Sequence, residues 1–340
     1  MESGTPQKIE GNPPEAPFSG PGRLAPSPTG ALHLGNARSF LIGWALARRE
    51  GRGLLMRVED LDGPRVKRGA ERAALDTLAW LGLDWDGPLL RQSDDLAPYT
   101  DAMSSLAGAG LAYPCAMSRQ EILEAASAPQ QAKPGEGPGE VRFPPHLRPP
   151  GLGSSAFDER EISWRFAVPQ GPVPFTDRVV GQVVVNPFET VGDFAVWTGR
   201  GQPSYQLACM VDDAGLGMHE PIGQVVRGDD LIDSAGRQLL LARSLGEWEH
   251  SGPEWVHLPL VVGEDGRRLA KRHGDTRVSV YREASVRPER VVGLLAWWSG
   301  VLTERGEMSA AEFRDAFSLD RMPRDPVVCT SEDDRWLRGG

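Results

Sequence analysis

A tight turn followed by the start of a helix carries the first candidate chemistry in this sequence. Ser27-Pro28-Thr29-Gly30 precedes His33-Leu34-Gly35-Asn36, where a helical spacing of apolar residues begins. The N-terminus of a helix binds phosphate groups, because its first N–H groups are unpaired and partly positive. Gly30 and Gly35 let the backbone approach such a ligand closely, and His33 can donate to a phosphate oxygen. The turn therefore predicts a nucleotide site, with a plain strand-to-helix turn as the alternative.

A basic loop in the C-terminal third carries the second candidate chemistry. Arg267-Arg268-Leu269-Ala270-Lys271-Arg272 follows the run His257-Leu258-Pro259-Leu260-Val261-Val262 and a Gly263–Gly266 turn. A lysine held on such a loop can neutralise the charge that develops on a pyrophosphate leaving group. A solvated basic loop is the alternative for this motif taken alone. The first motif is neither a Walker A loop nor a dinucleotide fingerprint.

The first motif resembles a signature of the glutamyl group of class I aminoacyl-tRNA synthetases. Residues 23–30, together with His33 and Gly35, are similar to the segment that carries the HIGH sequence of that family. Asn36 stands where the family has the last histidine, and a small polar residue there can still cap the helix. We therefore expect the family's ATP site at this turn.

The second motif resembles the KMSKS loop of the same family. Arg268 replaces its first lysine and Ala270 its serine, whereas Lys271 keeps the position of the second lysine. The resemblance implies ATP and Mg²⁺ as cofactors. It also implies a catalytic set of His33, Gly35, Asn36 and Lys271, and an ATP-binding set that adds Arg268.

A glutamate substrate asks for a particular set of charges. It presents two carboxylates and one ammonium group, so its pocket needs about two arginines and one carboxylate. The resemblance implies that Arg23 and Arg227 bind the carboxylates, Glu59 binds the ammonium group and Tyr205 forms a hydrogen bond. It also implies that Ala25 and Ser27 line the same pocket. Surface salt bridging is the alternative for any one of these pairs. The aspartates at 212–213 and 229–230 fit the family pattern without a role that the sequence assigns.

The length of the chain after the basic loop distinguishes branches of the family. Residues 272–340 are too few for a stem-contact region plus the anticodon-binding domain of ~150 residues that discriminating synthetases carry. We therefore expect no anticodon-binding domain, and the chain resembles the truncated branch, the glutamyl-Q tRNA(Asp) synthetases. Residues 231–238 also look like that branch. The resemblance implies ATP-dependent activation of glutamate and its transfer to the queuosine base in the anticodon of tRNA(Asp).

The zinc site of many relatives is degenerate in this sequence. Residues 113–119 resemble the Cys-x-Cys part of that site, with Met117 in place of the second cysteine. Gly137 and Val141 replace the later tyrosine and cysteine. Only Cys115 remains, and one thiolate cannot fill a tetrahedral zinc site. We therefore expect no zinc, an inert thiol at Cys115, and an inserted subdomain that is held together in some other way.

The elements around these residues alternate between strands and helices. A strand at 23–24, a helix over 35–49, a buried strand at 53–58 and a helix over 68–81 predict a parallel α/β sheet. Residues 162–197 favour an antiparallel insertion. A strand at 225–226 precedes a helix over 234–245, and further helices are expected over 287–301 and from a capping box at Ser309.

The expected organisation combines these elements with the resemblance. We predict an α/β fold in which a class I, Rossmann-like parallel sheet carries an acceptor-binding-like insertion and a short C-terminal helical region. The expected segments are a disordered tail (1–21), the first half of the catalytic domain (22–110), the insertion (111–195, with a Pro/Gly-rich loop at 128–156), the second half (196–260), and the Lys loop with C-terminal helices (261–340).

Composition excludes several classes of protein. No apolar run reaches the roughly 18 residues of a transmembrane helix, and no signal peptide is visible. The three cysteines lie far apart, which favours a reducing, cytoplasmic setting. A net charge of -10 argues against non-specific coating of nucleic acid, although not against a local basic face.

Several functions stay open on the sequence alone. We expect a monomer that binds glutamate and queuosine-bearing tRNA(Asp). The alternatives are a short glutamyl-tRNA synthetase that charges tRNA(Glu), a nucleotidylyltransferase of the His-x-Gly-His type, and a non-catalytic RNA-binding relative. ATP–pyrophosphate exchange separates the enzymes from the binder.

Overall fold

Seven strands form the central sheet of the computed structural model, which describes residues 19–126, 141–158, 162–217, 220–248, 252–267, 269 and 275–339. The neighbouring strands run parallel except for the last, which pairs antiparallel. Their order across the sheet is β3 (Leu89–Arg91), β2 (Leu54–Val58), β1 (Gly22–Leu24), β10 (Gln224–Gly228), β11 (Glu254–Leu258), β6 (Val173–Asp177) and β7 (Gly181–Val185). The predicted α/β class is confirmed.

Some predicted features lie outside the described residues. They are residues 1–18 of the expected tail, residues 128–140 of the Pro/Gly-rich loop, and the Lys-loop residues Arg268 and Lys271. In the described remainder of the Pro/Gly-rich loop, Pro145–Leu147 form a short 3₁₀ turn where no regular element was expected.

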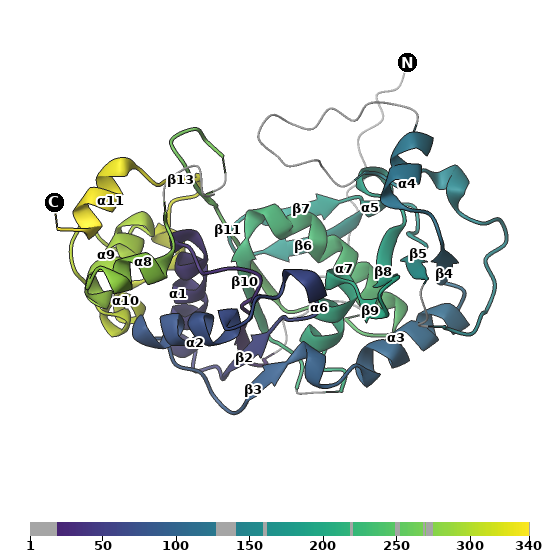
Figure 1. The fold of residues 1–340 in the computed structure, drawn as a ribbon, viewed down its shortest axis with the longest axis horizontal. Helices are drawn as coiled ribbons and strands as arrows, with labels where there is room; N and C mark the ends of the chain where they lie inside the picture. Colours follow the sequence, from purple (N-terminus) through teal and green to yellow (C-terminus); the bar gives the residue numbers. More distant parts are fainter. Residues whose placement is uncertain are drawn as a thin grey trace, which may run out of the picture.

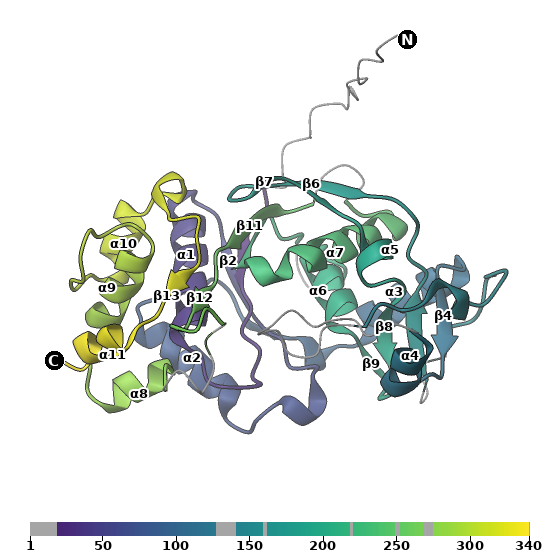
Figure 2. The ribbon, with the colours of Figure 1, turned by 90° about the horizontal axis from the view of Figure 1, so that it is seen from above.

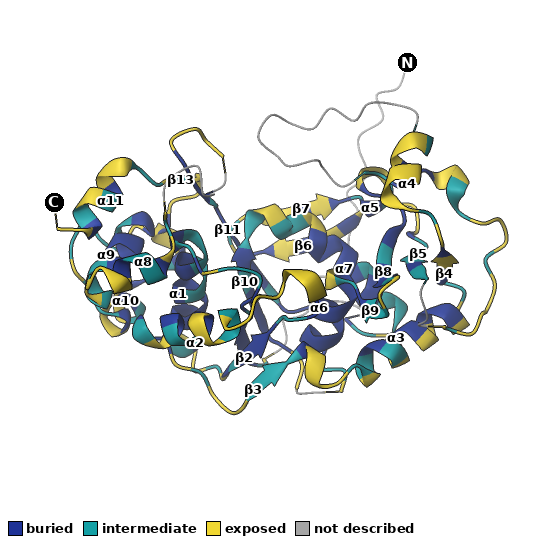
Figure 3. Ribbon diagram, viewed as in Figure 1, coloured by how far each residue is buried: buried dark blue, intermediate teal, exposed yellow. Residues whose placement is uncertain are grey.

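Helices cover both faces of the sheet (Figures 1 and 2). The helix α1 (Leu34–Arg49) lies on one face with the C-terminal helices, and α6 (Tyr205–Asp213) and α7 (Ile232–Ser244) lie on the other. Close approach of α1 to the sheet depends on Gly43, because a Cβ there would lie 3.3 Å from Cβ of Val226. The strands between these two layers are largely buried (Figure 3).

The predicted helices of the first and last thirds are present with small shifts at their ends. The expected helix over 68–81 is α2 (Ala70–Trp80), and that over 287–301 is α9 (Pro288–Trp298). Ser309 caps α10 (Ala310–Ala316) in the expected capping box. The other helices are α3 (Ala97–Gly108), α4 (Arg119–Ala125), α5 (Pro187–Thr190), α8 (Val278–Glu283) and α11 (Ser331–Leu337).

A second, antiparallel sheet contains only part of the expected insertion. It orders β4 (Ala112–Cys115), β5 (Ser163–Phe166), β8 (Phe194–Thr198) and β9 (Gln202–Pro203). The expected antiparallel insertion over 162–197 is divided between the two sheets. Its β6–β7 hairpin is antiparallel, but it extends the central sheet through the pair Asp177 and Trp255. The hairpin alternates buried and exposed residues, and that period is the same in either sheet, so the pattern does not select the partner strand.

The C-terminal region adds a short strand pair that was not predicted. β12 (Val261–Val262) and β13 (Val327–Val328) pair in parallel and join the end of the chain to the strand that follows β11. Two-residue strands give too little pattern to recognise in a sequence. Among the described residues, no helix has the length and apolar character needed to cross a membrane.

Candidate active site

A cleft of about 520 Å³ opens at the carboxyl ends of the parallel strands. It lies between β1 and β10, where the chain leaves one strand toward α1 on one face and the other toward α7 on the opposite face. Such a switch point is where open α/β sheets bind their ligands. Every candidate residue in the described part of the chain lines this cleft, namely Arg23, Ala25, Ser27, His33, Gly35, Asn36, Glu59, Tyr205 and Arg227.

The N-terminus of α1 forms one wall of the cleft. His33 is the N-cap, and its Nδ1 accepts the backbone N–H of Asn36 over 3.3 Å. The Asn36 side-chain oxygen accepts the backbone N–H of His33 in return, over 3.3 Å. With Nδ1 as acceptor, a neutral His33 ring carries its hydrogen on Nε2. Asn36 therefore completes the capping box of the helix. The Leu34 N–H donates to the Thr276 carbonyl and the Asn36 N–H to His33, so among the described residues it is the Gly35 N–H of this first turn that is left for an anion.

Gly35 gives this helix end its shape. A Cβ at this position would lie 3.0 Å from ring atoms of His33 and 3.4 Å from Cβ of Val261. Any side chain would therefore press on the capping histidine and narrow the cleft. The glycine is required here by space and not by its backbone conformation.

Arg23 in β1 and Glu59, the residue that follows the neighbouring strand β2, lie at the floor of the cleft. The Arg23 Nε donates to Asp213 over 3.1 Å, and its Nη groups form no hydrogen bond with the described residues. The Glu59 carboxylate accepts from Arg57 over 3.0 Å and from the Ser27 hydroxyl over 3.5 Å. A guanidinium end and a carboxylate thus lie next to each other, as an amino acid's carboxylate and ammonium groups would need.

Tyr205 and Arg227 complete the cleft from the other side of the sheet. Ser204 caps α6 and so places Tyr205 in the first turn, where its side chain is 43% exposed. Arg227, near the end of β10, is only 6% exposed. Its guanidinium donates to the side chains of His257 and Gln238, each over 3.0 Å, and to the carbonyl oxygen of Leu231 over 3.2 Å.

Arg227 forms no ion pair with a carboxylate of the described residues. The groups that it hydrogen-bonds are neutral, and its guanidinium also lies 4.9 Å from the centroid of the Trp255 ring. Burial lowers the pKa of Arg227, yet an arginine stays charged at neutral pH. A buried cation without a carboxylate is costly unless a ligand supplies one. This side of the cleft therefore fits an anionic group.

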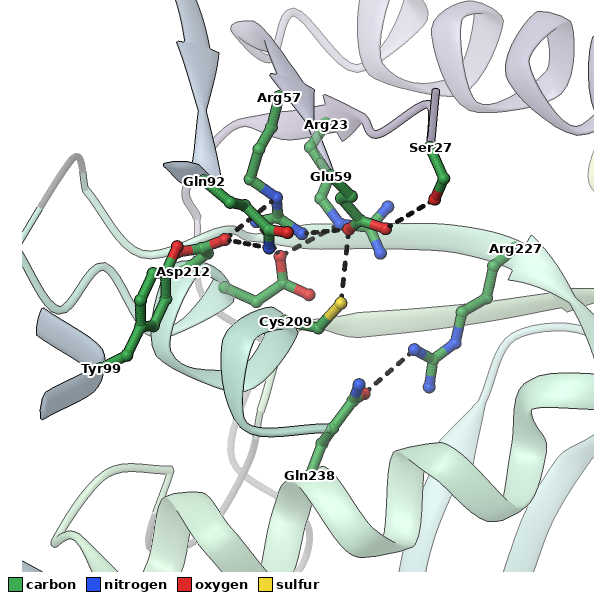
Figure 4. Close-up of polar contacts among 11 residues, drawn as sticks. Arg23, Ser27, Arg57, Glu59, Gln92, Tyr99, Cys209, Asp212, Arg227 and Gln238 are labelled. Carbon is green, nitrogen blue, oxygen red and sulfur yellow. Dashed lines mark hydrogen bonds and ion pairs between the residues drawn. The ribbon is translucent and has the colours of Figure 1, made fainter. Parts of the chain in front are cut away.

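A buried ionic network supports the floor of the cleft (Figure 4). The fully buried Arg57 pairs with Asp213 at 2.7 Å, with Glu59 at 3.0 Å and with Asp212 at 3.4 Å. Asp212 also accepts from Tyr99 and Gln92, at 2.8 and 2.7 Å. Because Asp213 binds both Arg57 and Arg23, the network holds Arg23 and Glu59 in one arrangement.

The pKa values of this network follow from burial and from the two guanidiniums. Burial opposes ionisation of Asp213, but Arg23 and Arg57 outweigh it and hold the pKa of that carboxyl below its usual range. Burial dominates for Asp212 and raises its pKa. Burial and the Glu59 charge raise the pKa of Cys209 well above its usual value. Cys209 is therefore a thiol that contacts Glu59 at 3.3 Å.

The positions of the degenerate zinc site form a small apolar core. Cys115 is buried with Tyr113, Ile122 and Phe143, and Met117 and Val141 pack against them. In the described ranges, no three His, Cys, Asp or Glu side chains gather to hold a metal ion. The absence of zinc stays a prediction. Met117 and Val141, which replace two zinc-ligating cysteines of the relatives, pack in this apolar core.

Four residues around the cleft received no role in the sequence analysis. His257 and Gln238 bind Arg227, and Asp177 binds His257, yet none of them received a role. Asp177 lies 80 residues from His257, so no local spacing links them. Arg57 was missed as well, although an arginine inside a buried strand signals that ionic partners must be present.

Comparisons with known proteins place this chain in a family. The family model for the catalytic domain of class I tRNA synthetases (E and Q) matches residues 21–333. A glutamyl-Q tRNA(Asp) synthetase of Rhodopirellula baltica is 42% identical over 321 residues, which cover 90% of this chain and 95% of that protein. A protein of the same name from Symbiobacterium thermophilum is 41% identical over 328 residues, with coverage of 94% and 98%.

A solved structure of a glutamate tRNA ligase is also similar to this chain. The crystal structure of a glutamate tRNA ligase from Elizabethkingia meningosepticum in complex with its amino acid has a TM-score of 0.73 and 25% identity. The match covers 93% of this chain and 68% of that one. The chain therefore belongs to the glutamate and glutamine group of class I tRNA synthetases and, within it, to the glutamyl-Q tRNA(Asp) synthetases.

Proposed function

We propose that this protein activates glutamate with ATP and transfers it to the queuosine base in the anticodon of tRNA(Asp). The observation that carries the proposal is the pair of arginines, Arg23 and Arg227, that line one cleft with Glu59 at the N-terminus of α1. Glutamate has two carboxylates and one ammonium group, and the cleft offers the opposite charge for each. The names of the relatives supply the tRNA and the modified base.

Glutamate would bind through three charged contacts. Arg227 binds one carboxylate through the N–H groups that do not donate to His257, Gln238 or Leu231. Arg23 binds the other carboxylate through its Nη groups. Glu59 takes the ammonium group, and Tyr205 adds a hydrogen bond from the rim. Ala25 and Ser27 line the remaining wall.

The first chemical step is adenylate formation. An oxygen of the α-carboxylate attacks the α-phosphorus of ATP, the new O–P bond forms, and the bond to pyrophosphate breaks. The N-terminus of α1 and His33 stabilise the negative charge on the phosphates. Asn36 and Gly35 hold that helix end in shape. Binding glutamate and ATP in one cleft supplies the alignment that this in-line attack requires.

The Lys loop is assigned to the leaving group. Arg268 and Lys271 lie outside the described residues, but the chain on both sides of Lys271 is anchored at the cleft. Leu269 donates to the Val261 carbonyl over 3.4 Å, and Leu34 at the start of α1 donates to the Thr276 carbonyl over 3.0 Å. We infer that Lys271 neutralises the pyrophosphate, with Arg268 beside it.

Magnesium enters this proposal with the nucleotide. Mg²⁺ usually binds through substrate phosphates with few protein ligands. The described residues contain no group of three metal-binding side chains. The phosphates of the bound ATP would therefore hold Mg²⁺, and the groups of the chain named above would bind and align the substrates.

The second chemical step is transfer. A hydroxyl of the queuosine ring attacks the carbonyl carbon of the glutamyl adenylate, the ester bond forms, and AMP leaves. No side chain needs to become a covalent intermediate, so positioning accounts for the acceleration.

We also propose that the protein acts as a monomer in the cytoplasm.

Transfer of labelled glutamate tests the proposal. The protein is supplied with ATP, Mg²⁺ and purified tRNA(Asp) with or without queuosine, beside tRNA(Glu). Label on queuosine-bearing tRNA(Asp) alone is the expected result. Label on tRNA(Glu) would make the protein a short glutamyl-tRNA synthetase, and label on none of them would make it a binding relative.

Adenylate formation by variants tests the residue roles separately. In ATP–pyrophosphate exchange, Lys271→Ala should depress kcat more than it raises the KM for glutamate. Arg227→Ala should mainly raise that KM, because Arg227 contacts the ground-state substrate. Unchanged exchange by Lys271→Ala would refute the assignment of the loop.

A further inference from the structure

His257 determines how the guanidinium of Arg227 is oriented. The Arg227 Nε donates to Nε2 of His257 over 3.0 Å. This bond requires a lone pair on Nε2, and therefore a neutral ring whose hydrogen is on Nδ1. An imidazolium carries hydrogen on both nitrogens and cannot accept the bond.

Asp177 fixes this tautomer. Its Oδ2 lies 2.7 Å from Nδ1 of His257 and accepts the backbone N–H of the same residue over 3.0 Å. Its Oδ1 accepts the backbone N–H groups of Val179 and Val180, over 2.8 and 2.9 Å. These donors outweigh burial and hold the pKa of Asp177 below its usual value. A carboxylate in this position accepts the Nδ1 hydrogen and leaves Nε2 free to accept from Arg227.

The surroundings of His257 keep its ring neutral. The ring is fully buried, and Trp255 stacks on it with ring centroids 5.9 Å apart. The charged groups that face it are Asp177 from β6 and Arg227 from β10. Burial lowers the pKa of His257 and the Arg227 charge lowers it further, against Asp177 and the Leu231 carbonyl.

Arg227 in turn is faced by Tyr205, Cys209, Arg23 and Asp213. The thiol and the phenol are neutral at neutral pH, and Asp213 is already paired with Arg23 and Arg57. Among the described residues, the His257 ring is therefore the titratable side chain that hydrogen-bonds directly to the Arg227 guanidinium.

We propose that His257 is a positioning residue for the substrate carboxylate: its neutral ring, oriented by Asp177, holds Arg227 so that the remaining N–H groups of the guanidinium face the cleft. The inference rests on the proposed function, in which Arg227 binds a carboxylate of glutamate. Proton uptake by His257 removes the acceptor and adds a positive charge beside Nε of Arg227. Proton binding at His257 and glutamate binding therefore oppose each other.

Two neutral amides at position 257 separate this role from packing. In His257→Gln the amide oxygen reaches the place of Nε2 and can accept from Arg227. In His257→Asn the amide reaches only the place of Nδ1, so it can contact Asp177 but not Arg227. Both variants remove the titratable ring, and both are first compared with the wild type by thermal unfolding.

Glutamate affinity is measured by isothermal titration calorimetry without ATP, from about pH 8 down to about pH 5.5. For His257→Asn we expect the Kd to rise about tenfold or more, and for His257→Gln we expect a change within about threefold. The wild-type Kd should rise as the pH falls through the pKa of His257, whereas that of His257→Gln should stay level.

The outcomes distinguish the inference from the function beneath it. Equal affinities of His257→Asn and the wild type, or a wild-type profile as level as that of His257→Gln, would overturn the role of His257. No glutamate binding by the wild type at any pH would overturn the proposed function itself. If neither variant folds, the wild-type pH profile decides alone: weakening on acidification supports the inference, and a level profile refutes it.

Discussion

Arg227 is the residue on which glutamate affinity should depend most. Arg227→Lys replaces a planar fork with a single ammonium, which cannot keep its contacts with His257, Gln238 and Leu231 and also bind a carboxylate through two N–H groups. We expect the KM for glutamate to rise roughly 10- to 100-fold in ATP–pyrophosphate exchange, with a smaller change in kcat. The control is Arg178→Lys, since Arg178 pairs with Glu50 and Glu254 at the other end of β11. An unchanged KM for Arg227→Lys would contradict the pocket.

Glu59 gives a second prediction at the same scale. Glu59→Gln keeps the shape of the side chain but removes the charge that Arg57 contacts and that we assign to the substrate ammonium group. We expect the KM for glutamate to rise about tenfold or more. Cys209→Ala is the matched control, because it removes only the thiol contact with Glu59 and should leave the KM nearly unchanged. Equal effects of the two variants would show that packing around Glu59, and not its charge, sets the affinity.

The helices of this fold differ in how closely other atoms pack against their glycine residues. α9 contacts α1 and α10 through buried residues, and its Gly293 lies directly against the backbone of Gly306. A Cβ at position 293 would clash with the Gly306 carbonyl oxygen, which cannot move without the chain. The close packing of α9 against the backbone at Gly306 therefore depends on the absence of a side chain at position 293.

This close approach predicts a large effect of a small change. Gly293→Ala should lower the free energy of unfolding by about 2 kcal/mol or more, although alanine is the better helix former. Gly108→Ala is the control, because Gly108 is also helical and no atom lies within 4 Å of its added Cβ. That variant should be neutral or slightly stabilising in urea unfolding. Equal stabilities of both variants would refute the clash.

The inserted region offers another prediction for its elements. The buried Asp193 accepts from Tyr113 over 2.6 Å and pairs with Arg148, next to the apolar core around Cys115. Asp193→Ala should therefore lower the free energy of unfolding by about 2–3 kcal/mol. A zinc-selective chelator should leave the melting temperature of the wild type unchanged. Glu189→Ala, which removes an exposed partner of Arg142, should cost less than about 1 kcal/mol. A fall in melting temperature with the chelator would show that the region does bind zinc.

At the scale of the whole molecule, buried charges link stability to pH. Burial lowers the pKa of His257, so below about pH 6.5 the unfolded chain takes up a proton that the folded protein does not. The pKa values of Asp177 and Asp213 are also lowered, so their contribution is lost as the pH falls below about 4. The raised pKa of Asp212 acts in the opposite direction.

Acid should therefore destabilise the fold in two ranges. We expect the free energy of unfolding in urea to fall as the pH drops below about 6.5, and to fall further below about pH 4. His257→Gln should flatten the first range and leave the second unchanged. A stability that is level from neutral pH to about pH 5 would contradict the neutral, buried state of His257.

Local chemistry explains the parts of this protein that its sequence predicted. The helix that His33 caps was recognisable because its cap, its glycine and its apolar spacing are adjacent in the chain. Arg23, Glu59, Tyr205 and Arg227 were recognisable because each stands in a short context that resembles one family. Their roles in binding stay proposals, but the fold brings them to one cleft.

Tertiary structure alone decided which distant residues support that cleft. The alternation of the β6–β7 hairpin fits either sheet, and only its pairing with β11 brings Asp177 to His257. The pairing joins residues 80 positions apart, and no local pattern encodes a contact that only the folded sheet creates. The sequence by itself thus determined the candidate residues that line the cleft and the elements that carry them. Packing decided what orients them, because orientation depends on neighbours that are distant in the chain.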